Sequence, residues 1–251
     1  MEIIGRGFLA RQLDEIAHRH PHAVVLAAGV SQVGLTDPAA FARETALVRR
    51  TARRCRETGR TLVFFSTASA GMYGAPGCTG REDCPHPSTP YGHHKLALEE
   101  LVRGSGCAFL ILRLSHLVGP GQAPHQLVPA LVRQVESGHV RVFRGVRRDL
   151  VDVREFVQVL DHLLDLGVTG EMINLASGSA VPVADVVTHL AALLGCEPRR
   201  EYVNLGGDHH VSVRKLRWIL PWGTSADYRA TLDRYALLYS ARATASGVRP
   251  H

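Results

Sequence analysis

The sequence predicts an α/β fold with a mainly parallel sheet, and two observations carry this prediction. Short apolar runs such as Thr61–Phe65 and Ala108–Leu114 alternate with longer segments that start at helix-capping residues, as strands and their connecting helices do. The chain also opens with a very short strand, Met1–Ile4, that leads into Gly5-Arg6-Gly7-Phe8-Leu9-Ala10 and a helix expected to end near Arg19. A Gly-x-Gly-x-x-Ala turn between a strand and a helix is typical of dinucleotide-binding domains, because it lets the backbone approach a pyrophosphate closely.

A second helix is expected to begin at Thr89-Pro90, because Thr is a good N-cap and Pro suits the first helical position. On this helix Tyr91 and Lys95 are four residues apart, so their side chains leave the same face about one turn apart. A phenol normally has a pKa of about 10, and a fixed cation nearby would lower the pKa of Tyr91 toward the range that a general acid/base needs. The alternative is a surface Tyr that stacks on the stem of a Lys.

The strand at 61–65 runs into Ser66-Thr67-Ala68-Ser69-Ala70-Gly71-Met72-Tyr73-Gly74. A strand that ends in small hydroxyl residues, followed by a helix with Tyr and Lys, resembles the extended short-chain dehydrogenase/reductases that act on sugar nucleotides. In that family the strand ends in Ser-x-x-x-Tyr-Gly, and the catalytic hydroxyl lies four residues before this Tyr. The resemblance therefore implies a catalytic triad of Ser69, Tyr91 and Lys95.

The stretch between the glycine turn and the serine strand is shorter than this family usually has. Residues 23–31, Ala-Val-Val-Leu-Ala-Ala-Gly-Val-Ser, end like the family's fourth strand, and a helix that starts at Thr36-Asp37-Pro38 and runs to about Thr58 is expected next. We infer that the second and third strands are missing, so that the Rossmann-like sheet is shortened. The rival interpretation, an ordinary second strand at residues 23–30, leaves too few residues for the strands that should follow.

This deletion affects the expected cofactor, which the resemblance gives as NAD or NADP. No Asp or Glu is placed to bind the ribose hydroxyls, whereas Arg6, Arg11 and Arg19 could meet a 2′-phosphate, which favours NADP slightly. A truncated adenosine pocket should also hold the cofactor loosely, which favours a reductase that exchanges its nicotinamide over an epimerase that retains it. The resemblance places these residues at the cofactor: Gly5, Arg6, Gly7, Phe8, Leu9, Ala27, Ala28, Gly29, Tyr91, Lys95 and Leu117.

The strand at 108–114 continues into a segment that looks like the family's Leu-Arg-x-x-Asn-x-x-Gly-Pro, beside the nicotinamide and the sugar phosphates. His116 stands where Asn is usual. Since a His titrates near neutrality, His116 could be a second acid/base group. The alternative is a polar substitute that only hydrogen-bonds the substrate or the backbone.

Later segments supply the other expected substrate contacts, beside Ser69 itself. By resemblance Gln126 and Phe143 would contact the nucleotide, although a plain amphipathic helix and core strand would look much the same. Arg148 lies in a segment that resembles Arg-Asp-Phe-x-x-Val, where the planar guanidinium would bind a substrate phosphate rather than form a surface ion pair. Asp208 would bind the nucleotide ribose, but the Arg that relatives carry before it is replaced here.

Composition limits the class of protein. The 251 residues are 45% hydrophobic, yet no stretch has the roughly eighteen uncharged apolar residues that a membrane span needs. The chain begins in a strand-like run without an export leader, and its five cysteines form no Cys-x-x-Cys pair. None of the fourteen histidines has the spacing of a metal site. We expect a soluble, cytoplasmic protein with no membrane partner and no metal.

The charge balance is basic, with a formal net charge of +6. Lys95 and Lys215 are the only lysines, and the arginines are scattered along expected helices without interleaved aromatic residues. A solvated, arginine-rich helix face explains this pattern better than a nucleic-acid surface does. The charge also favours a small anionic substrate such as a nucleotide diphosphate.

Together the motifs favour an oxidoreductase that acts on a nucleotide-activated sugar, with NAD(P) as hydride donor and Tyr91 as proton donor to a ketosugar. Two alternatives stay open: an epimerase that retains NAD, and a cofactor-binding protein without catalysis. A non-sugar ketone also stays open as the substrate. Ala70-Gly71 follow Ser69, where dehydratases of the family usually have Asp-Glu, which argues against elimination.

The expected organisation is an NAD(P)-binding Rossmann-like domain at residues 1–121 and 150–178. Residues 122–149 and 179–251 would form a small C-terminal substrate lobe that closes a cleft. The helices at 37–58 and 90–104 correspond to the dimer face of relatives, so the resemblance implies a homodimer.

Overall fold

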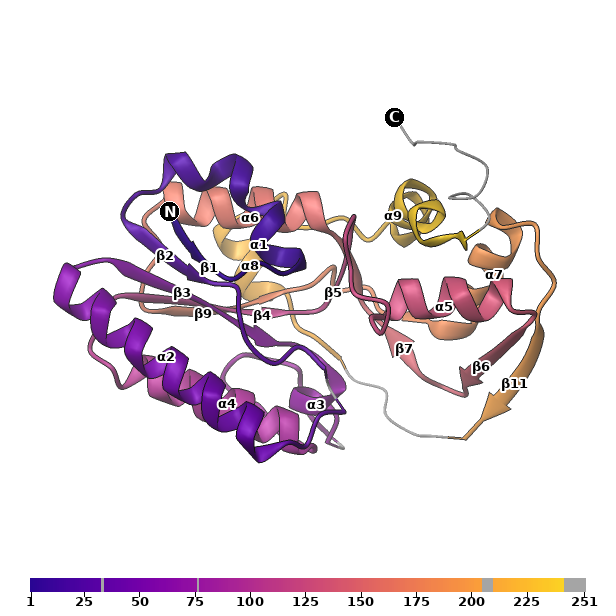
Figure 1. The fold of residues 1–251 in the computed structure, drawn as a ribbon, viewed down its shortest axis with the longest axis horizontal. Coiled ribbons are helices and arrows are strands. Elements are labelled where there is room, and N and C mark those ends of the chain that lie inside the picture. Colours follow the sequence, from indigo (N-terminus) through magenta and orange to yellow (C-terminus); the bar gives the residue numbers. More distant parts are fainter. Residues whose placement is uncertain (33, 76, 205–209, 242–251) are drawn as a thin grey trace.

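The computed structural model describes residues 1–32, 34–75, 77–204 and 210–241 of the chain. Its centre is a parallel sheet with the strand order β1-β2-β3-β4-β9 (Figure 1). The five strands are β1 (Glu2–Ile4), β2 (Ala23–Leu26), β3 (Thr61–Thr67), β4 (Phe109–Leu114) and β9 (Glu171–Leu175). The predicted α/β fold with a mainly parallel sheet is confirmed.

The sheet is shortened in the expected way. Strand β1 pairs directly with β2, with Glu2 opposite Val24 and Ile4 opposite Leu26, and β2 pairs in turn with β3. In the described part of the chain no further strand lies outside β1, so β1 forms the edge of the sheet. The two strands that normally lie outside the first one are therefore absent here, which confirms the predicted deletion.

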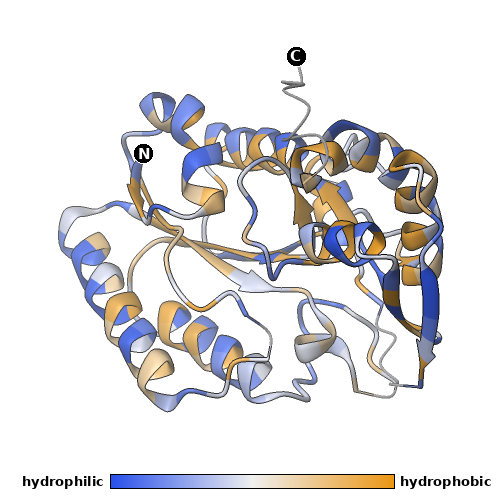
Figure 2. Ribbon diagram, turned by 45° about the vertical axis from the view of Figure 1, so that its right-hand side comes forward, coloured by the Kyte–Doolittle hydropathy of each residue, from blue (hydrophilic) through white to orange (hydrophobic). Residues whose placement is uncertain are grey.

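Helices cover both faces of the sheet because successive strand residues point to opposite sides. Val24 and Leu26 pack with residues of α2 (Pro38–Thr58) and α4 (Pro90–Arg103), whereas Val25 packs with the opposite layer that includes α6 (Val153–Asp165). Figure 1 shows α2 and α4 below the sheet, with α1 and α6 above it. The strands are mostly hydrophobic and the helices carry stripes of both kinds (Figure 2), as expected for a three-layer domain.

The predicted helix starts are confirmed. The Asp37 carboxylate accepts a hydrogen bond from the Ala39 N–H at 2.9 Å, and Pro38 occupies the first turn of α2. Thr89 caps α4 in the same way, since its hydroxyl accepts from the Gly92 N–H at 3.0 Å. Helix α2 ends at Thr58 because Gly59 adopts a left-handed conformation (φ +66°).

The first helix differs from its prediction. A single helix to about Arg19 was expected, but α1 (Phe8–Gln12) is followed by a 3₁₀ segment, η1 (Asp14–Arg19). Leu13 and Ile16 are both buried and lie three residues apart. A 3₁₀ turn repeats every three residues and therefore directs both side chains to one side, into the core.

The remaining elements lie mostly at one end of the sheet, to the right in Figure 1. Three two-stranded pairs occur there: β5–β8, β6–β11 and β7–β10. The strands are β5 (His116–Val118), β6 (His139–Phe143), β7 (Arg147–Arg148), β8 (Leu150–Asp152), β10 (Val181–Pro182) and β11 (Arg199–Val203). The other helices are α3 (Ala70–Tyr73), α5 (Leu127–Glu136), α7 (Val183–Leu193), α8 (Arg214–Ile219), α9 (Tyr228–Tyr235) and the 3₁₀ segment η2 (Ala236–Tyr239).

We propose the two-part division expected from the sequence, with one change. Helix α8 packs against β9, and the Lys215 ammonium donates to the Met172 carbonyl at 2.8 Å. Val211 and Val213 are buried with Ala68 behind the serine strand. The segment from Val211 to α8 therefore belongs with the sheet domain rather than with the substrate lobe.

A buried ion pair joins α4 to the sheet. Arg113 of β4 is fully buried and donates to both Glu99 carboxylate oxygens, at 2.8 and 2.6 Å. A third contact runs from the same guanidinium to the Tyr73 hydroxyl at 2.6 Å. Because these charges are shielded from water, each depends on its partner.

Glu99→Gln is expected to lower the free energy of unfolding by about 3 kcal/mol, since the Arg113 charge would stay buried without a counter-ion. Urea denaturation of the variant measures this loss. The exposed Arg53–Glu57 pair is the control, and Glu57→Gln should cost less than about 0.5 kcal/mol. Equal effects of the two substitutions would show that burial does not set the strength of the Arg113 pair.

Candidate active site

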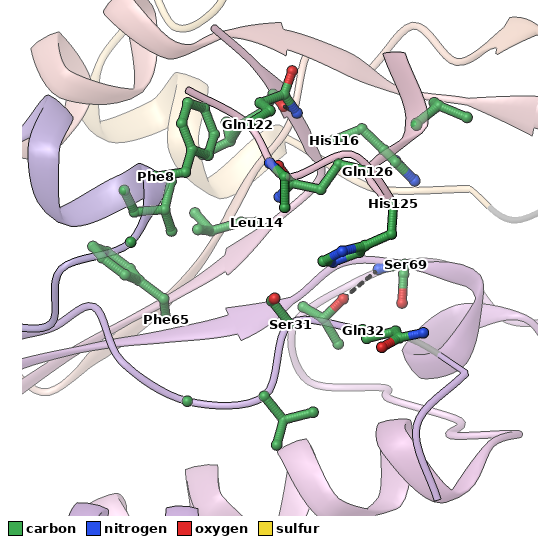
Figure 3. Close-up of a pocket in the computed structure, with 18 of the residues that line it drawn as sticks. Phe8, Ser31, Gln32, Phe65, Ser69, Leu114, His116, Gln122, His125 and Gln126 are labelled. Carbon is green, nitrogen blue, oxygen red and sulfur yellow. Dashed lines mark hydrogen bonds between the residues drawn. The ribbon is translucent and has the colours of Figure 1, made fainter. Parts of the chain in front are cut away.

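A cavity of about 1080 Å³ opens at the carboxyl ends of the parallel strands. Its lining comes from the glycine turn after β1, the loop after β2, the end of β3, helix α4 and the segment after β4. Figure 3 shows Phe8, Phe65 and Leu114 toward one end and Ser69, Gln32 and His125 toward the other. Parallel α/β sheets bind ligands at this edge, and the volume exceeds what one small ligand needs, roughly 300–1,000 Å³.

The two glycines of the turn after β1 have different surroundings: Gly5 is tightly packed, and Gly7 faces open space in the cavity. Gly5 has φ +141°, and a Cβ there would lie 2.5 Å from the Ala27 carbonyl oxygen, so no other residue fits. Gly7 lines the cavity, and a Cβ on it would meet no atom within 4 Å. The turn therefore leaves a backbone cradle at Gly7 that a larger side chain would fill, which fits the pyrophosphate of a dinucleotide.

Ser69 is held at the cavity by local hydrogen bonds. It caps the short helix α3, and its hydroxyl oxygen accepts from the Gly71 N–H at 3.3 Å. Its own N–H donates to the Thr67 hydroxyl at 3.1 Å, the bond drawn in Figure 3. A serine hydroxyl has one hydrogen to donate, which Ser69 can offer to a carbonyl oxygen in the cavity.

Tyr91 and Lys95 share one buried face of α4, as their spacing predicted. Both line the cavity while being only 5% and 4% exposed. The Lys95 ammonium lies 5.7 Å from the centre of the Tyr91 ring and 2.8 Å from the Glu44 carboxylate. The structure therefore brings Ser69, Tyr91 and Lys95 to one cavity and excludes the alternative of a surface Tyr stacked on a Lys.

The charge balance around the phenol differs from expectation. Burial raises the pKa of Tyr91 above its ordinary value, and the Glu44 carboxylate adds to this rise. The Lys95 charge and a hydrogen bond with Thr67 both lower the pKa of Tyr91, but they do not outweigh burial. The expectation that Lys95 brings this pKa below its usual range is thus corrected: Lys95 acts in the predicted direction, but the net direction is upward.

Most of the other predicted site residues also line the cavity. They are Arg6, Gly7, Phe8, Leu9, Ala27, Ala28, Gly29, Leu117, His116, Gln126 and Arg148. Gly5 lies behind the cradle, packed on Ala27. The Gln126 carboxamide oxygen accepts from the Ala123 N–H at 2.8 Å, which fixes the start of α5.

Two expectations are not met at the cavity, and a third concerns a residue that the structure does not describe. Phe143 is not among the lining residues and packs, half-buried, on the hydrophobic core. Arg19 forms an ion pair with Asp161 and another with Asp165 at 2.6 Å, so it does not reach the cofactor site. Asp208 lies outside the described residues.

Sequence reasoning missed several residues at this site. Thr67 stands two residues before Ser69, and the alternation along a strand end could have indicated that both side chains share one side. His125 lines the cavity next to Gln126. Glu44 is one carboxylate within a long, charged helix, and nothing in its sequence neighbourhood marks it.

The described part of the chain shows neither a metal-binding cluster nor a membrane-spanning helix. Among the residues placed by the structure, no three His, Cys, Asp or Glu side chains gather so as to hold a metal ion. None of the helices in those ranges combines the length and apolar character that crossing a membrane requires.

Comparison with known proteins identifies the family. Residues 9–176 match the NAD dependent epimerase/dehydratase family, and the chain belongs to it. The resemblance drawn from the Ser69, Tyr91 and Lys95 motifs, to short-chain dehydrogenase/reductases of the extended type, is confirmed. Members of this family use NAD or NADP, and the glycine cradle fits such a dinucleotide.

Relatives differ in reaction. The chain is similar to dTDP-glucose 4,6-dehydratase of Xanthomonas campestris pv. campestris, at 28% identity over 222 residues that cover 79% of this chain and 62% of the dehydratase. It is also similar to GDP-6-deoxy-D-mannose reductase of Pseudomonas aeruginosa, at 26% identity over 200 residues covering 70% and 64% of the two chains. The chain thus spans less than two thirds of the length of these relatives.

A solved structure extends the likeness to the whole fold. MoeE5 in complex with UDP-glucuronic acid and NAD superposes with a TM-score of 0.75 at 25% identity, over 97% of this chain and 86% of MoeE5. A UDP-galactose 4-epimerase structure has a TM-score of 0.79 at 19% identity, over 94% and 97% of the two chains, which supports the fold alone.

Gly5→Ala and Gly7→Ala are expected to separate folding from cofactor binding. Gly5→Ala should lower the free energy of unfolding by about 2 kcal/mol. An alanine rarely adopts the positive φ of this position, and its Cβ would clash with the Ala27 carbonyl oxygen. Gly7→Ala should cost less than about 1 kcal/mol but weaken NAD(P)H binding at least about tenfold, since the methyl group would occupy the cradle. Thermal unfolding and nucleotide fluorescence titration measure the two effects, and undiminished binding by Gly7→Ala would exclude the cradle as the pyrophosphate site.

Proposed function

We propose that this protein is an NAD(P)-dependent reductase of a ketosugar carried on a nucleotide diphosphate. The observation that supports reduction is the state of Tyr91, a buried phenol whose pKa lies above its ordinary value. A phenol that keeps its proton at neutral pH can donate that proton to a carbonyl oxygen, whereas oxidation of a hydroxyl needs the phenolate as base. Both belong to one reversible reaction, and a phenol that carries its proton is the form that the reductive direction uses.

The side chains divide the work as follows. The Ser69 hydroxyl and the Tyr91 phenol donate hydrogen bonds to the carbonyl oxygen of the substrate, which polarises the carbonyl and holds it near the cofactor. A reduced nicotinamide in the site supplies the hydride. Tyr91 then gives its proton to the developing alkoxide, and the Lys95 charge stabilises the phenolate that remains. Leu117 and the loop of Ala27, Ala28 and Gly29 shape the space for the cofactor.

Other residues that line the cavity would contact the substrate. Arg148 lines it and carries the fork of donors that suits a diphosphate. Gln126 and His116 line the same region, where they would hydrogen-bond the sugar or the nucleotide. MoeE5 binds a uridine diphosphate sugar, and the relative from Pseudomonas aeruginosa is named for a reductase reaction, so both agree with this choice.

The cofactor preference is proposed to be NADP over NAD, by a small margin. Arg6 and Arg11 line the cavity beside the glycine turn, and Arg11 also donates to the Gly121 carbonyl at 2.9 Å. Arg6 is exposed, so it can move to meet a 2′-phosphate. Family resemblance further supports a homodimer through α2 and α4, and five cysteines without a Cys-x-x-Cys pair support a cytoplasmic location.

Tyr91→Phe is expected to reduce turnover of a ketosugar nucleotide by about 10²–10⁴-fold, because it removes the proton donor. Cofactor binding, measured by NADPH fluorescence, should change little. Deuteride transfer from labelled NADPH to the sugar carbon identifies the product. Tyr73→Phe is the matched control, since it removes a buried hydroxyl that bonds Asn174 and Arg113 outside the cavity; its turnover should stay within a few-fold.

Stereoinversion of a sugar nucleotide by protein purified without added cofactor would instead indicate an epimerase with retained NAD. Failure to transfer deuteride to any ketosugar or simple ketone, with cofactor still bound, would favour a non-catalytic binding protein. Both outcomes contradict the proposed reductase.

Arg6→Gln is expected to weaken NADPH binding about five- to tenfold while leaving NADH binding within about twofold, because only NADPH carries the 2′-phosphate. Fluorescence titration with each nucleotide measures both constants. An equal loss for the two nucleotides would remove the basis for the NADP preference.

A further inference from the structure

Glu44 places a buried carboxylate directly behind the cofactor loop. It lies on α2 and is 3% exposed. A Cβ on Gly29 would lie 2.1 Å from its Oε1 atom, so the carboxylate forms the floor under this turn. Gly29 itself lines the cavity, with φ +142°.

Two consecutive residues of α4 hold this carboxylate. The Lys95 ammonium donates to Oε1 at 2.8 Å, and the His94 ring nitrogen Nε2 lies 2.8 Å from Oε2. The His94 ring is in turn stacked on Phe41 of α2, with centroids 4.2 Å apart and planes within 14°. A carboxylate with so little water around it needs such partners, which makes the arrangement rigid.

The Lys95 ammonium interacts with two groups, the Glu44 carboxylate and the Tyr91 ring. One of its three N–H donors is bound to Glu44, and its positive charge also faces the Tyr91 ring, 5.7 Å away at the centroid. Charges that act on Tyr91 come from α4 through Lys95 and from α2 through Glu44, while β3 contributes the Thr67 hydroxyl. The other ionisable groups along the cavity are Arg6, Arg11, His116, His125 and Arg148.

We propose that Glu44 is a positioning residue that fixes the direction of Lys95 and offsets part of its charge, so that less of this charge acts on the Tyr91 phenol. This inference rests on the proposed reductase function and deepens it, because it adds a residue outside the triad to the burial that raises the pKa of Tyr91. Glu44 touches neither substrate nor carbonyl in this scheme. It acts through Lys95 and through its own negative charge.

The direct test is the titration of Tyr91 in the free protein, followed by the ¹³Cζ resonance of labelled tyrosine and assigned with Tyr91→Phe. In the unsubstituted protein Tyr91 should remain a phenol through pH 10, since its pKa is raised from 10.0. Glu44→Gln should move this titration about one to two pH units lower, because loss of a negative charge favours the phenolate. No shift, or a shift to higher pH, would overturn the proposal.

Three variants exclude a general structural effect. Glu155→Gln removes a partly buried carboxylate on α6, where it bonds Ser225, and should leave the Tyr91 titration in place. Glu44→Asp keeps the charge and should restore most of the original titration. In a Lys95→Met background the Glu44→Gln shift should become smaller, because part of it acts through the ammonium; an undiminished shift would contradict that part of the proposal.

Kinetics provide the second readout. The reductive reaction needs the protonated phenol, so kcat/KM should fall as pH rises through the pKa of Tyr91. In Glu44→Gln this alkaline limb should move to lower pH by the same amount as the resonance. A shifted resonance with no reduction of any ketosugar by either protein would refute the proposed function but not the role of Glu44, whereas normal reduction with an unmoved resonance would refute only the latter.

Discussion

The direct parallel pairing of β1 with β2 determines the layout of this molecule. Because Ile4 is opposite Leu26, the chain leaves both strands at the same level, and Gly5 packs against the Ala27 carbonyl. This contact brings the glycine turn and the Ala27–Gly29 loop to one edge of the cavity. In a sheet with two more strands the adenosine half of the cofactor would gain a wall beyond β1; here that side ends with the edge strand. The shortened sheet thus keeps the part of the fold that holds the reacting end of a dinucleotide.

The pKa of Tyr91 depends on two charged groups, Lys95 and Glu44, that are buried near it. A cation beside a phenol is often taken as sufficient to produce a phenolate, but burial and a second charge oppose it here. Lys95 is bound to Glu44, and water is largely excluded from the Tyr91 ring, so the phenol keeps its proton. The pKa of Tyr91 is therefore set by its burial and by the charges of Lys95 and Glu44 together, and the triad alone does not fix it.

Polar residues in the interior of this fold serve two separate purposes. Arg113, Glu99 and Tyr73 form a closed network that ties α4 to β4 away from the cavity. Glu44 of α2 and Lys95 of α4 form a second pair, and its Lys95 side lines the cavity. The first network explains why α4 is held firmly enough for the second to keep its geometry.

Local sequence was sufficient for most of the helices and strands and for the placement of Ser69, Tyr91 and Lys95 at one cavity. The spacing of Tyr91 and Lys95 behind the Thr89 cap fixes both on one helical face, and Ser69 follows a strand that ends in hydroxyl residues. These features depend on backbone periodicity and capping, which act over a few residues. The missing strands could also be read from the sequence, because too few residues separate the glycine turn from the serine strand.

Long-range contacts were decided only by the tertiary structure. Glu44 meets Lys95 across 51 positions, and Arg19 is drawn from the cofactor side to Asp161 across 142 positions. Phe143 turned out to serve the core, since an alternating strand does not reveal which of its faces meets a ligand. The sequence by itself therefore determined which groups, Ser69, Tyr91 and Lys95, come together at the cavity. Burial and the packing of α2 on α4 decided which charges act on Tyr91, because electrostatic energies depend on distance and burial, which no local pattern encodes.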